Sequence, residues 1–184
     1  MPNNCENELT ISADDENDGA NLAIWAAIRN EEGTGPDFNK LFQYPEAWAA
    51  ADKAARDFNA MFWALPADER AARADEWRSR PHDGYHHGGY EWCCENWGTK
   101  WNAYDCKALS VPTEEEPYLP ISLAFDTAWG PAKKIAAEIA RRWPSACVSL
   151  NFWERGMAFQ GTATWKSGEV EVEFEAPYHG HRGG

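Results

Sequence analysis

The 184-residue sequence predicts an α+β fold, in which an antiparallel sheet carries helices on one face. Three observations lead to this prediction. Several short segments alternate apolar and polar side chains, which is the pattern of half-buried strands. Other segments repeat apolar side chains every three to four residues, as helices do. The final third of the chain holds alternating segments joined by short turn sequences, which predicts antiparallel neighbours.

The first half predicts one strand followed by a helical insertion. The strand covers residues 8–13, where Leu9 and Ile11 share one side, and it ends in an acidic turn. Apolar residues then follow helical spacing over 20–30, 45–65 and 67–78. We treat residues 19–80 as a helical insertion within a single domain that spans 1–177.

The second half predicts the rest of the sheet. A helix is expected at 131–143, and residues 178–184 are expected to form a flexible tail. Strands are expected at 99–109, 119–127, 147–153, 157–165 and 169–176. The order strand, helical region, strand, strand, helix, strand is the split βαβ order of a ferredoxin-like sandwich, and the last two strands add a C-terminal hairpin.

The charge of the chain restricts its partners. The formal charge is −13 and the isoelectric point is near 4.7. Affinity for a nucleic-acid backbone comes from basic residues that displace counterions, so we expect no direct nucleic-acid binding and favour a partner with a basic surface. The charge also serves solubility, and both interpretations stay open. The sequence has no run of 18 apolar residues and no basic-then-apolar start, which predicts a cytoplasmic protein with no membrane contact.

Four segments of the sequence resemble, in the same order, signatures of the YubB-like proteins of phages and plasmids. They are Met1 to Asn7 (MPNNCEN), Glu95 to Trp101 (ENWGTKW), Thr127 to Trp129 (TAW) and Glu154 to Gly161 (ERGMAFQG). The resemblance implies a ferredoxin-like domain and a mobile-element origin, and it brings no catalytic residues. Asn4 stands where the family commonly has Trp, and Gly130 where it commonly has Ser or Pro. A shared surface built on that Trp would be altered in this chain.

Tryptophans gather in the middle of the chain. Trp92, Trp97 and Trp101 fall within eleven residues, and Trp129 follows at the end of the next predicted strand. Flat indole faces can stack a base or clamp a peptide, at about 1–3 kcal/mol for each base. Core packing explains the cluster equally well. The Asn96-Trp97-Gly98 sequence favours a tight turn that brings at least one indole near the surface.

An acidic strand is the second candidate site. Glu169, Glu171, Glu173 and Glu175 alternate with apolar residues, so a regular strand places four carboxylates on one face, about 6.7 Å apart. Further acids stand at Asp14, Asp15, Glu16, Asp18 and 114–116. Together they can imitate a nucleic acid toward a basic protein. The alternative is a solvated outward face that protects an edge strand from aggregation.

Cysteines and histidines offer weaker signals. Five irregularly spaced cysteines predict reduced thiols, and we expect Cys93 and Cys94 on opposite faces of a strand without a bridge. A zinc site needs about four soft ligands at suitable spacing. Candidates are present, but their spacing matches no familiar pattern, and a solvated loop is the preferred interpretation. The candidate ligands are His82, His86, His87, Cys93 and Cys94.

No signature of catalysis is present. Gly33 and Gly35 lack the third glycine of a phosphate-binding loop, and no local sequence marks an activated thiol. Asp126 and Glu154 can act as an acid and base pair only where the fold brings them together. We therefore expect no enzyme, no metal and no cofactor.

The leading functional hypothesis is a noncatalytic phage- or plasmid-encoded protein that inhibits a host protein, a component of antiviral defence, by occupying its basic surface. The four glutamates attract the partner over long range, and the tryptophans anchor it. One alternative is a protein that sequesters a nucleotide or signalling ligand, with Lys100, Lys107 and Arg155 as the nearby basic groups. Another is a metal-dependent enzyme that uses the histidine and cysteine loop. The sequence leaves the oligomeric state open.

Overall fold

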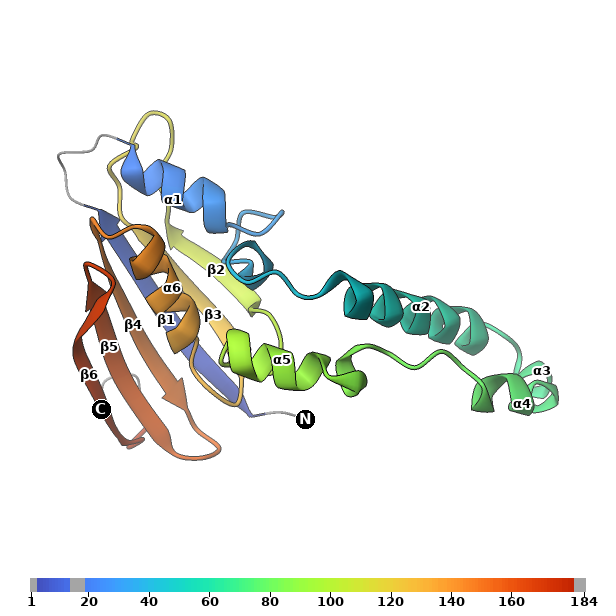
Figure 1. Cartoon of the computed structure of the whole chain (residues 1–184). Coiled ribbons are helices and arrows are strands. Elements are labelled where there is room, and N and C mark those ends of the chain that lie inside the picture. Colours follow the sequence, from blue (N-terminus) through green and yellow to red (C-terminus); the bar gives the residue numbers. More distant parts are fainter. Residues whose placement is uncertain (1–2, 14–18, 181–184) are drawn as a thin grey trace. The chain divides into compact units, whose positions relative to one another are not determined.

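Six strands form one antiparallel sheet in the order β2-β3-β1-β4-β5-β6 (Figure 1). The computed structural model describes residues 3–13 and 19–180. The strands are β1 (Asn4–Ala13), β2 (Tyr104–Ser110), β3 (Ile121–Ala128), β4 (Ala146–Glu154), β5 (Phe159–Lys166) and β6 (Glu169–Pro177). Strands β2, β3, β1 and β4 have the split βαβ arrangement, and β5 and β6 extend it as a hairpin. The predicted ferredoxin-like α+β fold is confirmed.

Helices α1 (Ala20–Ile28) and α6 (Lys133–Arg142) lie on one face of this sheet (Figure 1). The core fills the space between them and the sheet. Its largest fully buried side chains include Leu9, Ile11, Leu123, Phe125, Ile135, Ile139, Leu150 and Phe152. They alternate along β1, β3 and β4 and recur at helical spacing in α6, as half-buried elements require. We call the other side of the sheet the open face.

The chain divides into two compact units. One consists of residues 1–43 with 94–184, and the other of residues 44–93. The expected insertion at 19–80 overlaps the second unit from residue 44, whereas α1 belongs to the first. The second unit contains α2 (Glu46–Trp63), α3 (Ala67–Ala72), α4 (Ala74–Arg78), the 3-10 turn η2 (Tyr85–His87) and most of α5 (Gly89–Asn96). Within the described ranges, no helix combines the length and apolarity needed to cross a membrane.

Three local predictions are wrong. Residues 67–78 form α3 and α4 rather than one helix, because Arg73 between them has φ −102° and ψ 27°, outside helical geometry. Residues 89–96 form helix α5, so Cys93 and Cys94 lie on a helix and not on opposite faces of a strand. The strand expected from residue 99 begins at Tyr104. All five cysteines are free thiols.

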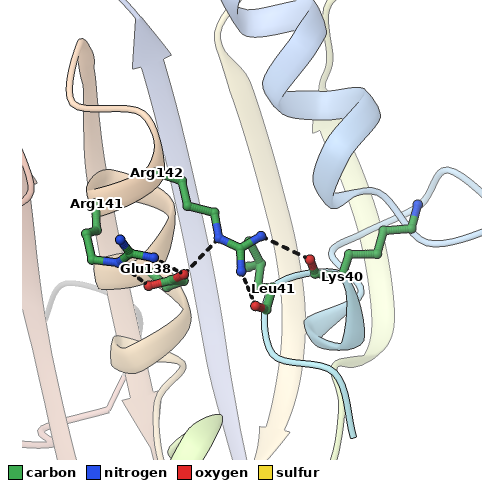
Figure 2. Close-up of polar contacts among 5 residues, drawn as sticks. All are labelled: Lys40, Leu41, Glu138, Arg141 and Arg142. Atoms are coloured by element: carbon green, nitrogen blue, oxygen red, sulfur yellow. Dashed lines mark hydrogen bonds and ion pairs between the residues drawn. The ribbon is translucent and has the colours of Figure 1, made fainter.

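A buried glutamate of α6, Glu138, holds Arg142, which in turn joins α6 to the 3-10 turn η1 (Phe38–Lys40), as Figure 2 shows. Glu138 accepts hydrogen bonds from Arg141 Nε at 2.7 Å and from Arg142 Nε at 2.8 Å. Arg142 also donates to the carbonyl oxygen of Lys40 at 3.2 Å and to that of Leu41. The hydrogen bond from Arg141, reinforced by Arg142, holds the pKa of Glu138 below its ordinary value of 4.5.

This lowered pKa predicts a pH-dependent loss of stability. The contribution of Glu138 is complete above the ordinary carboxyl pKa and disappears as the pH falls through the lowered one. We expect Glu138→Gln to cost about 1–2 kcal/mol of unfolding free energy at neutral pH. Urea titrations between about pH 6 and about pH 3 should show the gap to the wild type closing toward acid. The exposed Glu31 gives the control Glu31→Gln. A difference in unfolding free energy between the wild type and Glu138→Gln that stayed constant with pH would contradict the stabilising role of ionised Glu138.

Candidate partner-binding site

The four segments that carry the YubB-like resemblance meet at one end of the sheet (Figure 1). Trp129 at the end of β3 donates its backbone N–H to the carbonyl of Asn3 at 2.9 Å. Gly156, in the turn between β4 and β5, lies so close to Asn3 that a Cβ atom would overlap the asparagine side chain. A Cβ on Gly130 would lie 3.6 Å from the carbonyl oxygen of Gly98. Met1 and Pro2 lie outside the described residues.

Asn7 ties the first of these segments to the third and to the start of α6. Its buried amide donates to the carbonyl of Cys5 and to Thr127 Oγ1, each at 2.8 Å. Its Oδ1 accepts the backbone N–H of Ala132 at 3.1 Å, just before α6. Thr127 in turn donates to the carbonyl of Gly130 at 2.7 Å. Because buried polar groups need partners, Asn7 and Thr127 have a structural role here.

Glu154 has a similar role at the end of β4. It is fully buried and accepts the backbone N–H groups of Gly156, at 2.9 Å, and of Met157, which fixes the turn into β5. Burial, together with the charge of Glu154, raises the pKa of Cys5 to about 12. The Cys5 thiol therefore stays protonated and is not an activated nucleophile.

Asp126 and Glu154 do not form a catalytic pair. Cys5 is paired with both Thr127 and Glu154, so these two residues share the helix-covered face. Asp126 precedes Thr127 on β3 and therefore points to the open face. The two carboxylates lie on opposite sides of the sheet, and the condition for acid and base work on one substrate is not met.

The four predicted tryptophans have different environments. Trp97 is buried, with Nε1 donating to the carbonyl of Phe42 at 2.9 Å. Trp92 lies half-buried on α5, and its ring centroid is 5.6 Å from that of Tyr44. Trp101 is half-buried, and Trp129 is 42% exposed. Trp101 and Trp129 come together around one lysine, whereas Trp97 serves the core.

Lys100 lies between these two indoles. Its Nζ is 4.8 Å from the ring centroid of Trp101 and 4.6 Å from that of Trp129, which is within cation–π distance of both. We call this group, Trp101 and Trp129 around Lys100, the indole clamp. Trp129 has φ +70°, a left-handed conformation that bulky residues rarely adopt and that often marks functional sites.

Polar groups support the indole clamp from β1 and β2. The Tyr104 ring packs edge-on against Trp101, with 6.4 Å between centroids, and its hydroxyl donates to Asn4 Oδ1 at 2.9 Å. Asn4 donates to Asp126 Oδ2 at 3.1 Å. Burial, followed by the charges of Asp126 and Asp105, raises the pKa of Tyr104 to about 12, so the hydroxyl remains a donor. Asn4, where the YubB-like family commonly has Trp, thus orients this support by hydrogen bonds.

The four glutamates of β6 do not form a single row. Paired residues share a face of a sheet, and the β5–β6 register shifts by one residue along the hairpin. Lys166 pairs with Glu169, whereas Ala163 pairs with Glu173. Since Lys166 and Ala163 lie on opposite faces of β5, Glu169 and Glu173 do too. The prediction of four carboxylates on one face is therefore wrong, because a bulge interrupts the alternation.

Lys133 of α6 neutralises part of this strand from the helix-covered face. Its Nζ lies 2.9 Å from Glu173 Oε1, 3.3 Å from Glu175 Oε2 and 4.8 Å from the ring centroid of Phe152. Within the described part of the chain, Glu169 and Glu171 have no ion-pair partner. The acidic strand therefore keeps two uncompensated charges.

Strand β6 is also an edge of the sheet with exposed apolar side chains. Val170 is 52% exposed, Val172 51% and Phe174 61%. An edge strand presents unpaired backbone groups, and exposed apolar side chains beside them mark an interaction surface. We call β6 with these side chains and its glutamates the acidic edge. Of the other acids expected to add to it, Asp14, Asp15, Glu16 and Asp18 lie outside the described residues. Residues 114–116 lie in the loop between β2 and β3, and β2 is the strand at the opposite edge of the sheet from β6.

The histidine and cysteine loop is not assembled as a metal site. His86 Nδ1 lies 2.7 Å from Asp83 Oδ1, and the rings of His82 and His87 meet edge-on at 5.2 Å. Among residues 3–13 and 19–180, no group of three or more His, Cys, Asp or Glu side chains has a geometry that could hold a metal ion.

Comparison with known proteins agrees with the fold. Residues 97–181 match the family model of the ferredoxin-like domain in Api92-like protein. This segment starts at the buried Trp97 and includes β2 to β6. The match covers less than half of the chain and agrees with the ferredoxin-like fold of these strands.

One solved structure is similar along the whole chain. The crystal structure of protein api92 from Yersinia pseudotuberculosis aligns with 99% of this chain and 100% of its own, with 9% sequence identity and a TM-score of 0.46. No curated protein matches the sequence.

Proposed function

We propose that this chain is a noncatalytic acidic protein, encoded by a phage or plasmid, that binds and inhibits a host protein in the bacterial cytoplasm. The target is a component of antiviral defence with a basic surface. The acidic edge carries the proposal, because it combines uncompensated carboxylates, exposed apolar side chains and a free strand edge. The setting in a mobile element rests on the four segments that resemble YubB-like proteins.

The acidic edge suits an extended basic segment of a partner. A partner strand that pairs with β6 gains main-chain hydrogen bonds along the edge, while Val172 and Phe174 become buried. Glu169 and Glu171 add to the net charge of −13. This charge speeds association with a basic partner and disfavours an acidic one. Because the carboxylates lie on two faces, the proposal no longer includes a regular ladder that imitates successive phosphates.

The indole clamp supplies a second contact. Its two ring faces already hold the ammonium group of Lys100, so their placement suits a cation. A lysine or arginine of the basic partner can take the same position, with Trp129 as the exposed anchor. This geometry favours a protein contact over nucleotide sequestration by Trp92, Trp97 and Trp101, since Trp97 is buried.

Capture from a host lysate tests the acidic edge. The double variant Glu169→Gln/Glu171→Gln removes two charges from β6, and the control Glu114→Gln/Glu115→Gln removes two exposed charges elsewhere. We expect the first pair to lower retention of the partner about tenfold at moderate salt, and the control to change it less than about twofold. Mass spectrometry identifies the retained protein. If both double variants lowered retention of the partner equally, net charge alone would explain the loss, and the proposed surface would be rejected.

A further inference from the structure

The helical unit, residues 44–93, contains two cavities whose linings hold three arginines and three histidines against one acid, although the chain as a whole is strongly acidic. The first has a volume of about 400 Å³ and is lined by Phe62, Trp63, Arg70, Trp77 and Arg78. The second has a volume of about 300 Å³ and is lined by Asn59, Arg80, His82, Asp83, His86 and His87. Small-molecule sites commonly measure about 300–1,000 Å³.

The two cavities follow one face of α2. Ala55 and Asn59 line the second cavity, and Phe62 and Trp63 line the first. Their spacing of four, three and one places them on successive turns of the same side of the helix. Arg80 and Trp77 mark the boundary, with the guanidinium carbon 4.7 Å from the indole centroid. Because the Arg80–Trp77 contact links the two linings, we treat the cavities together as one groove with two chemically different halves.

The first half offers aromatic surfaces. Trp63 is 58% exposed, and its ring centroid lies 5.4 Å from that of Trp77, which in turn lies 4.9 Å from that of Phe62. Arg70 stands over Trp63 at 5.1 Å and is held there by donating to the carbonyl of Leu65 at 2.7 Å. Exposed indole faces suit stacking by a planar aromatic ring.

The second half offers hydrogen-bond donors for an anion. Arg80 donates through Nη1 to the carbonyl of Trp77 at 3.1 Å, which leaves its other N–H groups for a ligand. The rings of His82 and His87 line the same cavity, with centroids 5.2 Å apart. Asp83 is the acid in the lining, and its carboxylate already accepts hydrogen bonds from His86. Phosphate is the anion that this set of donors fits best.

We propose that the groove binds a small molecule in which a planar aromatic ring is joined to a phosphate, the class of a nucleoside monophosphate. The ring stacks on Trp63 in the first cavity, and the phosphate accepts hydrogen bonds from Arg80, His82 and His87 in the second. Arg70 and Arg80 offset the repulsion that the net charge imposes on such a ligand, whereas Arg78 is already paired with Asp75 at 2.5 Å. The site is separate from the acidic edge and does not depend on the proposed function.

Calorimetric titration with adenosine 5′-monophosphate tests the groove. We expect binding that weakens at least about tenfold in Trp63→Leu and in Arg80→Gln, because each change removes one half of the recognition. Both side chains are exposed, so the variants should keep the fold, which circular dichroism checks. Two matched controls should change the affinity less than about twofold. They are Trp129→Leu in the other unit and Arg56→Gln on α2 outside the groove.

Fragments of the same probe separate the two halves. Adenosine lacks the phosphate and ribose 5-phosphate lacks the ring, so each should bind at least about tenfold more weakly than the whole molecule. Equal binding of adenosine would overturn the phosphate half, and no heat with the monophosphate up to about 5 mM would overturn the site. Lysate capture with Trp63→Leu should match the wild type, so a failed groove and a failed acidic edge give different results.

Discussion

Asn7→Ala is expected to lower the free energy of unfolding by about 3–5 kcal/mol. The asparagine amide joins β1 to Thr127 on β3 and to the backbone of Ala132 before α6. Its removal leaves a buried N–H, a buried hydroxyl and a buried carbonyl with fewer partners, and it opens a cavity. Urea denaturation followed by tryptophan fluorescence measures the change.

Asn151 provides the matched control for this substitution. It lies exposed on β4, and Asn151→Ala should change the unfolding free energy by less than about 0.5 kcal/mol. If Asn7→Ala cost no more than Asn151→Ala, the buried network would contribute nothing to stability, and the attachment of β1 to the end of β3 and to α6 would need another explanation.

Gly161→Val should cost about 3 kcal/mol and loosen the C-terminal edge of the sheet. A Cβ at this position on β5 would lie 2.5 Å from Cζ of Phe152 and closer still to the carbonyl oxygen of Phe174. The Phe152 ring is fully buried and the Phe174 atom belongs to the backbone, so neither can shift without a cost in free energy. We expect β6 to separate from β5, with faster hydrogen exchange at its amides.

Thr162→Val tests whether this effect belongs to the position. Thr162 is the neighbour of Gly161 on the open face and pairs with Phe174. Its replacement should leave amide exchange in β6 within about twofold of the wild type, since the side chain stays half-exposed. Equal acceleration in both variants would show that β6 is held weakly by the whole hairpin.

Periodicity predicted the strands and long helices because most of them have one buried and one exposed side. The alternation of Leu9 and Ile11 in β1 and the spacing of Ile135 and Ile139 in α6 report such sides directly. Helix α5 gave no such signal, since glycine, aromatic residues and cysteines have low helix propensity. The break at Arg73 was equally hidden, because alanine and charged residues continue on both sides.

The candidate site was predictable only in part. Sequence reasoning selected Trp101 and Trp129, but the burial of Trp97 depends on the carbonyl of Phe42, far away in the chain. The row of glutamates failed at a bulge, since β6 remains alternating in sequence where its pairing shifts. The groove was missed because its aromatic rings and arginines come from separate helical segments, and the sequence does not show that they pack together.

The buried groups around Asn7 and Glu154 stabilise the fold, and they are distinct from the surfaces proposed to bind a partner. The residues of the four segments mostly hold the ends of strands in place, whereas β6 and the groove on α2 are built from other residues. The residues of the binding surfaces can therefore change in evolution while these buried contacts are kept. Two chains that share these segments are expected to share the fold, and a shared binding partner does not follow from them.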